Sequence, residues 1–230
     1  YQSCFIAATE TYSEFNFNDL IGNLNFFNSK DSKEVKNKIV FYYRADYWRK
    51  WAGNAQLKNC IKLFTILKPF FSEHVEFCVV GDRDKGEFPL WIKDYRTESF
   101  SQSVDFQYNQ IFKSSLMCIG LTGSHMLFPS LFSKCTVHLH PSFKYKNMAE
   151  DIVVNENSNE MISAYKHLYY FGNHNCSDLT PEKLANLLLS HFMGLIEKEY
   201  KTNKSVDSQK EWIEKTYSLV HYNLIKKNIF

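Results

Sequence analysis

The sequence predicts an α/β fold with an open parallel sheet and helices on both faces, and two observations carry that prediction. Continuous apolar runs, typical of strands that are buried on both faces, recur along the chain. Between them lie longer stretches in which apolar residues repeat every three or four positions, as on one face of a helix. Strands that alternate with helices form right-handed βαβ units, so the expected architecture is Rossmann-like.

Five apolar runs are the predicted strands. The first, KIVFYY, is apolar or aromatic at every position after Lys38. Two of the others end at Gly81 and Pro141, residue types that commonly end strands. The predicted strands cover residues 38–43, 75–81, 116–120, 135–141 and 167–172.

Helices are predicted between and after these strands. The first follows a repeat from Leu57 to Phe71, with Pro69 near its end. A later one has Thr180 as its N-cap and Pro181 in its first turn. The predicted helices cover residues 57–71, 100–115, 126–134 and 181–195, and an amphipathic C-terminal helix covers about 207–227.

The chain of 230 residues is long enough for a large core, and 44% hydrophobic residues indicate a globular protein. We expect residues 1–35 to be a lead-in, a linker or a remnant of a preceding lobe. Residues 36–200 would form the Rossmann-like domain, and residues 201–230 a helix packed on it. Because the first residue is Tyr1, the chain reads as a processed product, a domain or a fragment.

Charge and cysteine usage narrow the expected partners and location. The net charge of +2 predicts no nucleic-acid partner, and no apolar run approaches the ~20 residues of a transmembrane helix. The six cysteines form no CxxC pair, which favours free buried thiols over disulfides. We therefore expect a cytoplasmic protein, with peripheral membrane association as a variant of that location.

Ligands of open parallel sheets bind where the strands end, so the loops after the strands are the first place to look for a site. The loop after the first strand combines cations with aromatic rings. Arginine forks match phosphate oxygens in pairs, a helix start adds backbone N–H groups, and the rings can stack on a base or sugar. The alternative is a solvated basic loop whose tryptophans are fixed in the core. The candidates are Arg44, Arg49, Lys50 and Asn54, with Tyr47, Trp48 and Trp51 between them.

A second candidate loop is GLTGSHML, residues 120–127, which follows the third predicted strand. Gly120 and Gly123 can bring the backbone close to a ligand and adopt positive φ. Thr122, Ser124 and the backbone N–H groups of the next helix start can hold a diphosphate. An ordinary βα turn, which also favours glycine and serine, is the alternative.

Other polar residues near strand ends carry weaker signals. Glu150 and Asp151 follow the fourth strand and a polar loop, where a carboxylate can accept hydrogen bonds from ribose hydroxyls; a helix-start acid is the alternative. His138 and His140 alternate on a strand and, with His125, raise the alternative of a metal site. No carboxylate or cysteine has matching spacing, so we predict no metal. The charged turn at residues 81–87 is expected to be solvated.

The segments VFYYRADYWRKWAGNAQL and CIGLTGSHMLFPSLFSKCTVHLHP together resemble the C-terminal, nucleotide-sugar-binding half of GT-B glycosyltransferases. They are most similar to the group of plant xylosyltransferases, the animal EGF-domain O-GlcNAc transferase and their bacterial relatives. Arg44, Arg49 and Asn54 match the family's order of two arginines and an asparagine at a helix start. Gly120 and Gly123, followed by Ser124, match its Gly-x-His-Gly-Ser/Ala turn. The resemblance covers about residues 36–155.

The resemblance implies transfer of a sugar from a nucleotide-diphosphate donor to a hydroxyl of a glycan or glycoconjugate, without a bound metal or other cofactor. Arg44, Arg49 and Lys50 would balance the charge of the leaving diphosphate, with backbone amides of residues 122–125 as donors. Asn54 would fix the loop or bond a phosphate oxygen. GT-B enzymes have two lobes, so an N-terminal lobe or partner chain is expected to complete the site.

The sequence departs from the family at Thr122, which stands where the family has histidine. Threonine cannot act as a base near neutral pH or carry positive charge. His125, about one helical turn further on, is the residue that can compensate, so Thr122 and His125 are the catalytic candidates. The alternative function is a non-catalytic nucleotide-sugar-binding or protein-interaction module that has lost activity.

Overall fold

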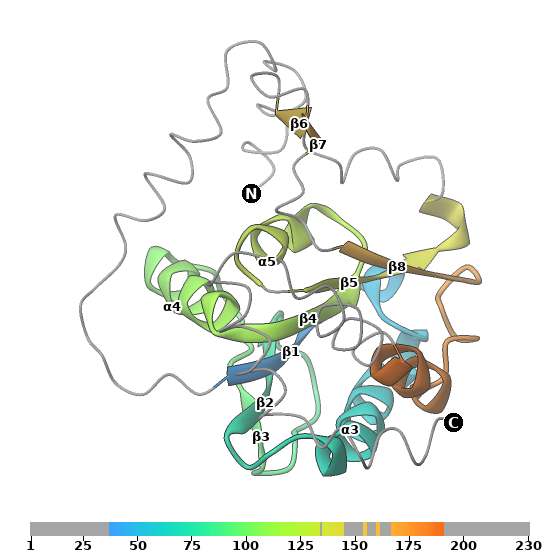
Figure 1. Ribbon diagram of the computed structural model, residues 1–230, viewed down its shortest axis with the longest axis horizontal. Helices are drawn as coiled ribbons and strands as arrows, with labels where there is room; N and C mark the ends of the chain where they lie inside the picture. The colour runs from blue at the N-terminus through green and yellow to red at the C-terminus, as the bar shows by residue number, and fades with distance from the viewer. Residues whose placement is uncertain (1–36, 134, 145–153, 156–159, 162–166, 191–230) are drawn as a thin grey trace, which may run out of the picture.

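The computed structural model describes residues 37–133, 135–144, 154–155, 160–161 and 167–190. Its centre is a six-stranded sheet in which every neighbouring pair is parallel (Figure 1). The strand order is β3-β2-β1-β4-β5-β8, and the α/β, Rossmann-like prediction is thereby confirmed. The strands are β1 (Asn37–Tyr43), β2 (Val75–Gly81), β3 (Ile92–Asp94), β4 (Ser115–Leu121), β5 (Thr136–Pro141) and β8 (His167–Gly172).

The strands form because their side chains are apolar on both faces. Every residue of β4 is buried, as are the last five residues of β1. Alternate side chains of β1 enter two separate clusters, with Phe41 on one face of the sheet and Tyr42 on the other. Both faces of the sheet therefore need a helical cover.

Helices supply that cover on each face. The cluster around Phe41 includes buried residues of α3 (Gln56–Leu67) and of the helix over residues 181–190. The cluster around Tyr42 includes residues of α4 (Gln102–Lys113), with partly buried side chains of α5 (Leu127–Phe132) packed against it. The Thr180 cap is present, since its Oγ1 accepts a hydrogen bond from the Lys183 N–H at 3.3 Å.

Sequence and structure differ at a few elements. The first helix is α-helical only to Leu67 and continues as a 3-10 turn over Lys68–Phe70, because Pro69 removes a helical donor. The strand β3 and the short antiparallel pair β6 (Val154–Asn155) and β7 (Glu160–Met161) were not predicted. Two or three residues are too short to show a period.

The strand order places the switch point of the sheet between β1 and β4. From β1 the chain builds β2 and β3 on one side, then crosses to build β4, β5 and β8 on the other. The loops after β1 and β4 diverge at this point, leaving room for a ligand between them. These are the two loops that carry the predicted site.

The five cysteines in the described residues are free and buried, as predicted: Cys60, Cys78, Cys118, Cys135 and Cys176. None of the described helices is both long and apolar enough to cross a membrane. Glu150, Asp151, the expected lead-in and the expected C-terminal helix lie outside the described residues.

Candidate functional site

The loop after β1 is fixed at its base by Trp51 and Gln56. Trp51 is fully buried, and its backbone N–H donates to Gln56 Oε1 at 3.1 Å. Gln56 in turn donates from Nε2 to the Arg44 carbonyl at 2.8 Å. The Trp51 indole N–H is shared between the carbonyls of Cys176 and Leu179, at 3.1 and 3.0 Å. The loop is thus held in one conformation by buried polar contacts.

The cations of this loop are largely paired with the loop after β2. Arg44 Nε lies 2.9 Å from Asp82 Oδ2 as an ion pair, and its N–H makes no hydrogen bond among the described residues. The same carboxylate accepts the Ala45 N–H at 3.1 Å, and Lys50 Nζ lies 2.7 Å from Asp84 Oδ2. The expectation that the charged turn at residues 81–87 is solvated was therefore wrong for its two aspartates, which position the basic loop.

Arg96, which the sequence analysis did not identify, connects the same carboxylates to the core. Its side chain is 1% exposed, and its guanidinium packs against the rings of both Tyr43 and Phe88, 4.7 and 4.6 Å from their centroids. It contacts Asp84 at 3.3 Å and Asp94 at 2.9 Å. Burial raises the pKa of Asp94, but hydrogen bonds from Arg96 outweigh it and hold the pKa below its ordinary value.

The two glycines of the turn after β4 provide space, and neither adopts the positive φ that was expected of them. Gly120 is a residue of β4 itself; a Cβ there would lie 2.6 Å from Met126 Sδ and 3.1 Å from Tyr42 Cβ. At Gly123, a Cβ would lie 3.0 Å from His125 Nδ1 and 3.5 Å from Lys144 Nζ. Glycine is therefore required here for the close approach of neighbouring side chains.

Thr122 is not free to hold a ligand as expected. Thr122 is only 3% exposed, and its backbone N–H already donates to the Leu139 carbonyl at 3.0 Å. Thr122 Oγ1 lies 3.5 Å from His138 Nδ1, and the Thr122 carbonyl accepts a hydrogen bond from Lys144 Nζ. Ser124, the next hydroxyl of the turn, is half-buried.

His125 is the residue of the glycine turn on which the nearby cations act. It is 5% exposed, packs edge-on against Tyr42 with ring centroids 4.8 Å apart, and its Nε2 has no hydrogen-bond partner among the described residues. Burial holds the pKa of His125 well below its ordinary value, and repulsion lowers it further. The repelling groups, largest effect first, are Arg44, Lys144, Arg49 and His138.

The charge effects on His125 indicate that the basic loop and the glycine turn lie near one another. Arg44 and Arg49 come from the loop after β1, Lys144 follows β5, and all three act on an imidazole in the turn after β4. Arg49 is exposed, and no ion pair to it is found within the described residues. Asn54 is exposed in the 3-10 turn Gly53–Ala55.

Exposed aromatic rings border this cationic region. Tyr47 and Trp48 are 61% and 69% exposed, with centroids 5.5 Å apart. His174 lies 6.3 Å from Trp48 and 4.8 Å from Phe143, so loops after β1, β5 and β8 contribute to one row of rings. Trp48 cannot be so exposed with both ring faces covered, and it therefore offers a face for stacking.

The histidine pair on β5 is buried. His138 is 1% exposed, and the ring of the fully buried His140 lies 5.3 Å from that of Phe171. No group of three potential metal ligands (His, Cys, Asp or Glu) is found among the described residues.

No known protein family, curated protein or solved structure matches this chain.

Proposed function

We propose that the carboxyl edge of the sheet binds the diphosphate of a nucleotide sugar. The chain would then be the donor-binding half of a glycosyltransferase that transfers the sugar to a hydroxyl acceptor. The observation that supports this proposal is the electrostatic effect of three cations, Arg44, Arg49 and Lys144, on the buried His125 at the switch point of the sheet. A diphosphate is the ligand whose charge and position match such a site.

The cations would have different roles. Arg49 is exposed and unpaired within the described residues, so it is the side chain best placed to meet an incoming phosphate. Arg44 and Lys50 are held by Asp82 and Asp84, and would set the local potential without leaving their partners. In transfer, the charge that grows on the leaving diphosphate would be stabilised by these cations in place of a metal ion.

Two further features fit a nucleotide sugar. His125 Nε2 is a buried nitrogen without a partner in the described residues, and it can donate to a phosphate oxygen when protonated there. The exposed rings of Tyr47 and Trp48 can stack on the base or on the sugar. The expected ribose contacts, Glu150 and Asp151, lie outside the described residues.

The proposal is tested by binding. A thermal-shift screen of the full chain against UDP-, GDP-, CMP- and ADP-sugars should identify a stabilising donor, because a ligand of the folded state raises its stability. Arg49→Gln should then weaken its affinity about tenfold in titration calorimetry. Arg83→Gln is the matched control, since Arg83 is also exposed but pairs with Asp94 at 3.6 Å. Equal affinity of both variants and the parent would contradict the proposal.

A second candidate function is a nucleotide-sugar-binding module without transferase activity. The burial of Thr122 favours it, because the family's histidine position is closed here and its amide is already bonded. The two functions differ in turnover. A donor that binds but is neither hydrolysed nor transferred by the full chain, whether Thr122 is retained or replaced in Thr122→His, would favour the module.

A further inference from the structure

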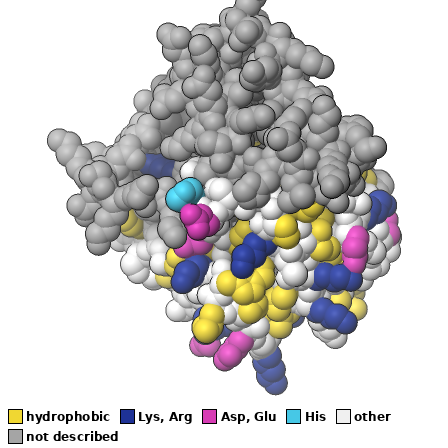
Figure 2. All heavy atoms as spheres, turned by 60° about the horizontal axis from the view of Figure 1, so that its bottom comes forward, with side chains coloured by type: hydrophobic (Ala, Val, Ile, Leu, Met, Phe, Trp, Pro, Cys, Tyr) yellow, Lys and Arg dark blue, Asp and Glu magenta, His cyan; other side chains and the backbone are white. Residues whose placement is uncertain are grey.

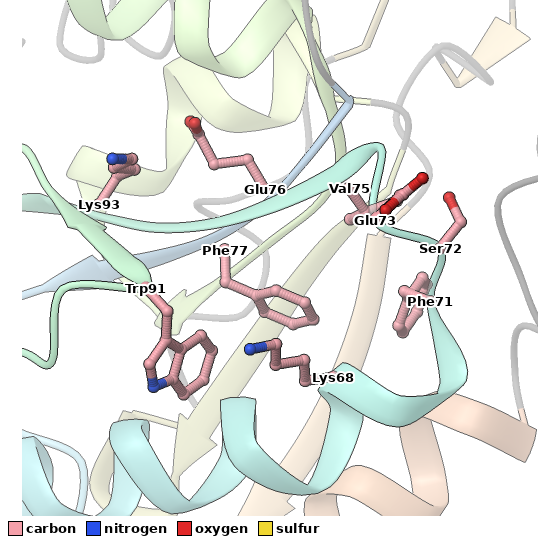
Figure 3. A pocket seen from close by; sticks show the side chains of 9 residues that line it. All are labelled: Lys68, Phe71, Ser72, Glu73, Val75, Glu76, Phe77, Trp91 and Lys93. Carbon is pink, nitrogen blue, oxygen red and sulfur yellow. The ribbon is translucent and has the colours of Figure 1, made fainter.

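A pocket lies at the amino-terminal end of the sheet, opposite the candidate site. Its volume is about 410 Å³, within the usual range for small-molecule sites of about 300–1,000 Å³. It lies on the part of the molecule that holds α3, β2 and β3, where charged side chains sit among hydrophobic ones (Figure 2). The residues that line it are Lys68, Phe71, Ser72, Glu73, Val75, Glu76, Phe77, Trp91 and Lys93 (Figure 3).

Three aromatic rings form one side of this pocket. The ring of Phe77 lies 6.1 Å from that of Phe71 and 6.0 Å from that of Trp91, with interplanar angles of 82° and 74°. Both neighbours thus stand nearly perpendicular to Phe77. Phe71 and Phe77 are buried, and the half-buried Trp91 presents the accessible part of this aromatic cluster. Such a cluster favours a flat apolar group, since aromatic rings prefer edge-to-face or offset packing.

Lys68 brings a positive charge to the aromatic side. Its Nζ lies 4.6 Å from the centroid of Trp91, and Figure 3 shows the amine reaching toward the rings of Trp91 and Phe77. No carboxylate in the described part of the chain forms an ion pair with it. Glu76 extends to the other side of the strand ribbon, where Lys38 lies 3.2 Å from its Oε1. Lys68 is exposed, so its ammonium is solvated, and it lies beside an apolar surface with no carboxylate partner in the described part of the chain.

The hydroxyl of Ser72 is a second unsatisfied group. Its Oγ is buried and has no hydrogen-bond partner among the described residues. A buried hydroxyl without a partner is unfavourable, and an acceptor atom of a ligand would satisfy it. Glu73 is exposed at the same end of the pocket and disfavours a ligand with more than one negative charge there.

We propose that this pocket binds a small aromatic carboxylate. Its ring would pack on the accessible part of this aromatic cluster, at Trp91, and its carboxylate would pair with Lys68. The site is independent of the proposed nucleotide-sugar site, because it lies at the other end of the strands. The closing experiment therefore does not depend on whether a donor binds.

The test uses three probes of one shape and different charge: phenylacetate, phenylacetamide and phenethylamine. Titrations of the full chain, followed by two-dimensional NMR of the indole N–H groups, should show phenylacetate binding with its largest shift at Trp91. Phenylacetamide should bind about tenfold more weakly, and phenethylamine more weakly still. Equal affinities, a preference for the amine, or shifts that leave Trp91 unchanged would overturn the proposal.

Two lysine variants separate the charge from the apolar surface. Lys68→Met keeps an apolar stem at the pocket and should abolish the preference for phenylacetate over phenylacetamide, with phenylacetamide binding retained. Lys58→Met, on the exposed surface of α3 and outside the pocket, should leave the preference unchanged. A preference that survives in Lys68→Met would overturn the assignment of the carboxylate to Lys68.

Discussion

Lys50 Nζ lies 2.7 Å from Asp84 Oδ2, and this ion pair joins the loop after β1 to the loop after β2. Asp84 also contacts Arg96 at 3.3 Å and accepts a hydrogen bond from the Tyr43 hydroxyl at 3.2 Å. One carboxylate therefore fixes a cation of the candidate site relative to the buried guanidinium below it. Removing this carboxylate should lower the stability of the fold more than it weakens ligand binding.

Asp84→Asn should lower the free energy of unfolding by about 1–3 kcal/mol, because a buried guanidinium loses one of its two carboxylate partners. Urea denaturation measures the change. Asp46→Asn is the control, since Asp46 is exposed and its ion pair with Arg44 is long, at 3.6 Å; we expect less than about 0.5 kcal/mol there. A difference between the two variants that is absent or reversed would show that Asp84 does not hold the loop.

The buried His125 should make the protein less stable as the pH falls. Burial and nearby cations keep its pKa below that of an unfolded histidine, so the unfolded state binds more protons between the two values. The free energy of unfolding should therefore fall below about pH 6.5, by up to about 1.4 kcal/mol per pH unit. His140, whose pKa is lowered chiefly by burial, acts in the same direction.

Denaturation at pH 7.5 and 5.5 measures this loss, in a range above the titration of ordinary carboxylates. His125→Asn should reduce the difference between the two pH values, and the remaining part would belong to His140 and other groups. His74→Asn, which changes an exposed histidine, should leave the difference as it is. An unchanged pH dependence in His125→Asn would mean that its imidazole is not held neutral by the fold.

Donor binding should be accompanied by uptake of a proton if the proposed site is right. A diphosphate placed among Arg49, Lys144 and His125 would offset the repulsion that lowers the pKa of the imidazole. Calorimetric titration of the best nucleotide sugar at pH 6.5, in PIPES and in imidazole buffers, measures the protons taken up per site. The uptake should vanish in His125→Asn; an identical enthalpy in both buffers for the parent chain would place the donor away from His125.

Gly120→Ala should destabilise the fold by about 1–3 kcal/mol, because the added methyl group would lie 2.6 Å from Met126 Sδ. The clash is with a flexible side chain, so shortening that side chain should relieve it. In a double-mutant cycle, Gly120→Ala combined with Met126→Ala should cost less than the sum of the two single changes. Additive effects would show that Met126 is not what excludes a side chain at residue 120.

The sheet could be predicted from the sequence because its strands are buried on both faces and read as continuous apolar runs. β1 and β2 are examples, and β3 was missed because it is only three residues long. The candidate site was only partly predictable. Asp82 and Asp84 resemble solvated turn residues in the sequence, and their pairing with Arg44 and Lys50 arises only when parallel strands bring two loops together.

The roles of the glycines and of Arg96 could not be predicted from the sequence either. Gly120 correctly indicated the position of the turn after β4. A glycine is needed there because Met126 packs against it, and that packing has no local sequence signature. Arg96 lies in a stretch without a period, and its burial depends on two rings, Tyr43 and Phe88, from different segments. Burial of charge is a tertiary property.

The indole N–H of Trp51 is shared between two carbonyls that lie 125 and 128 residues further along the chain. The loop that carries Arg44 and Arg49 consequently cannot reach its final shape until the turn after β8 has been synthesised and has docked. Contacts so distant in sequence form late, since a long loop must close first. A nascent chain that ends after β5 would carry most of the cations of the candidate site but would lack the turn after β8 that fixes their loop.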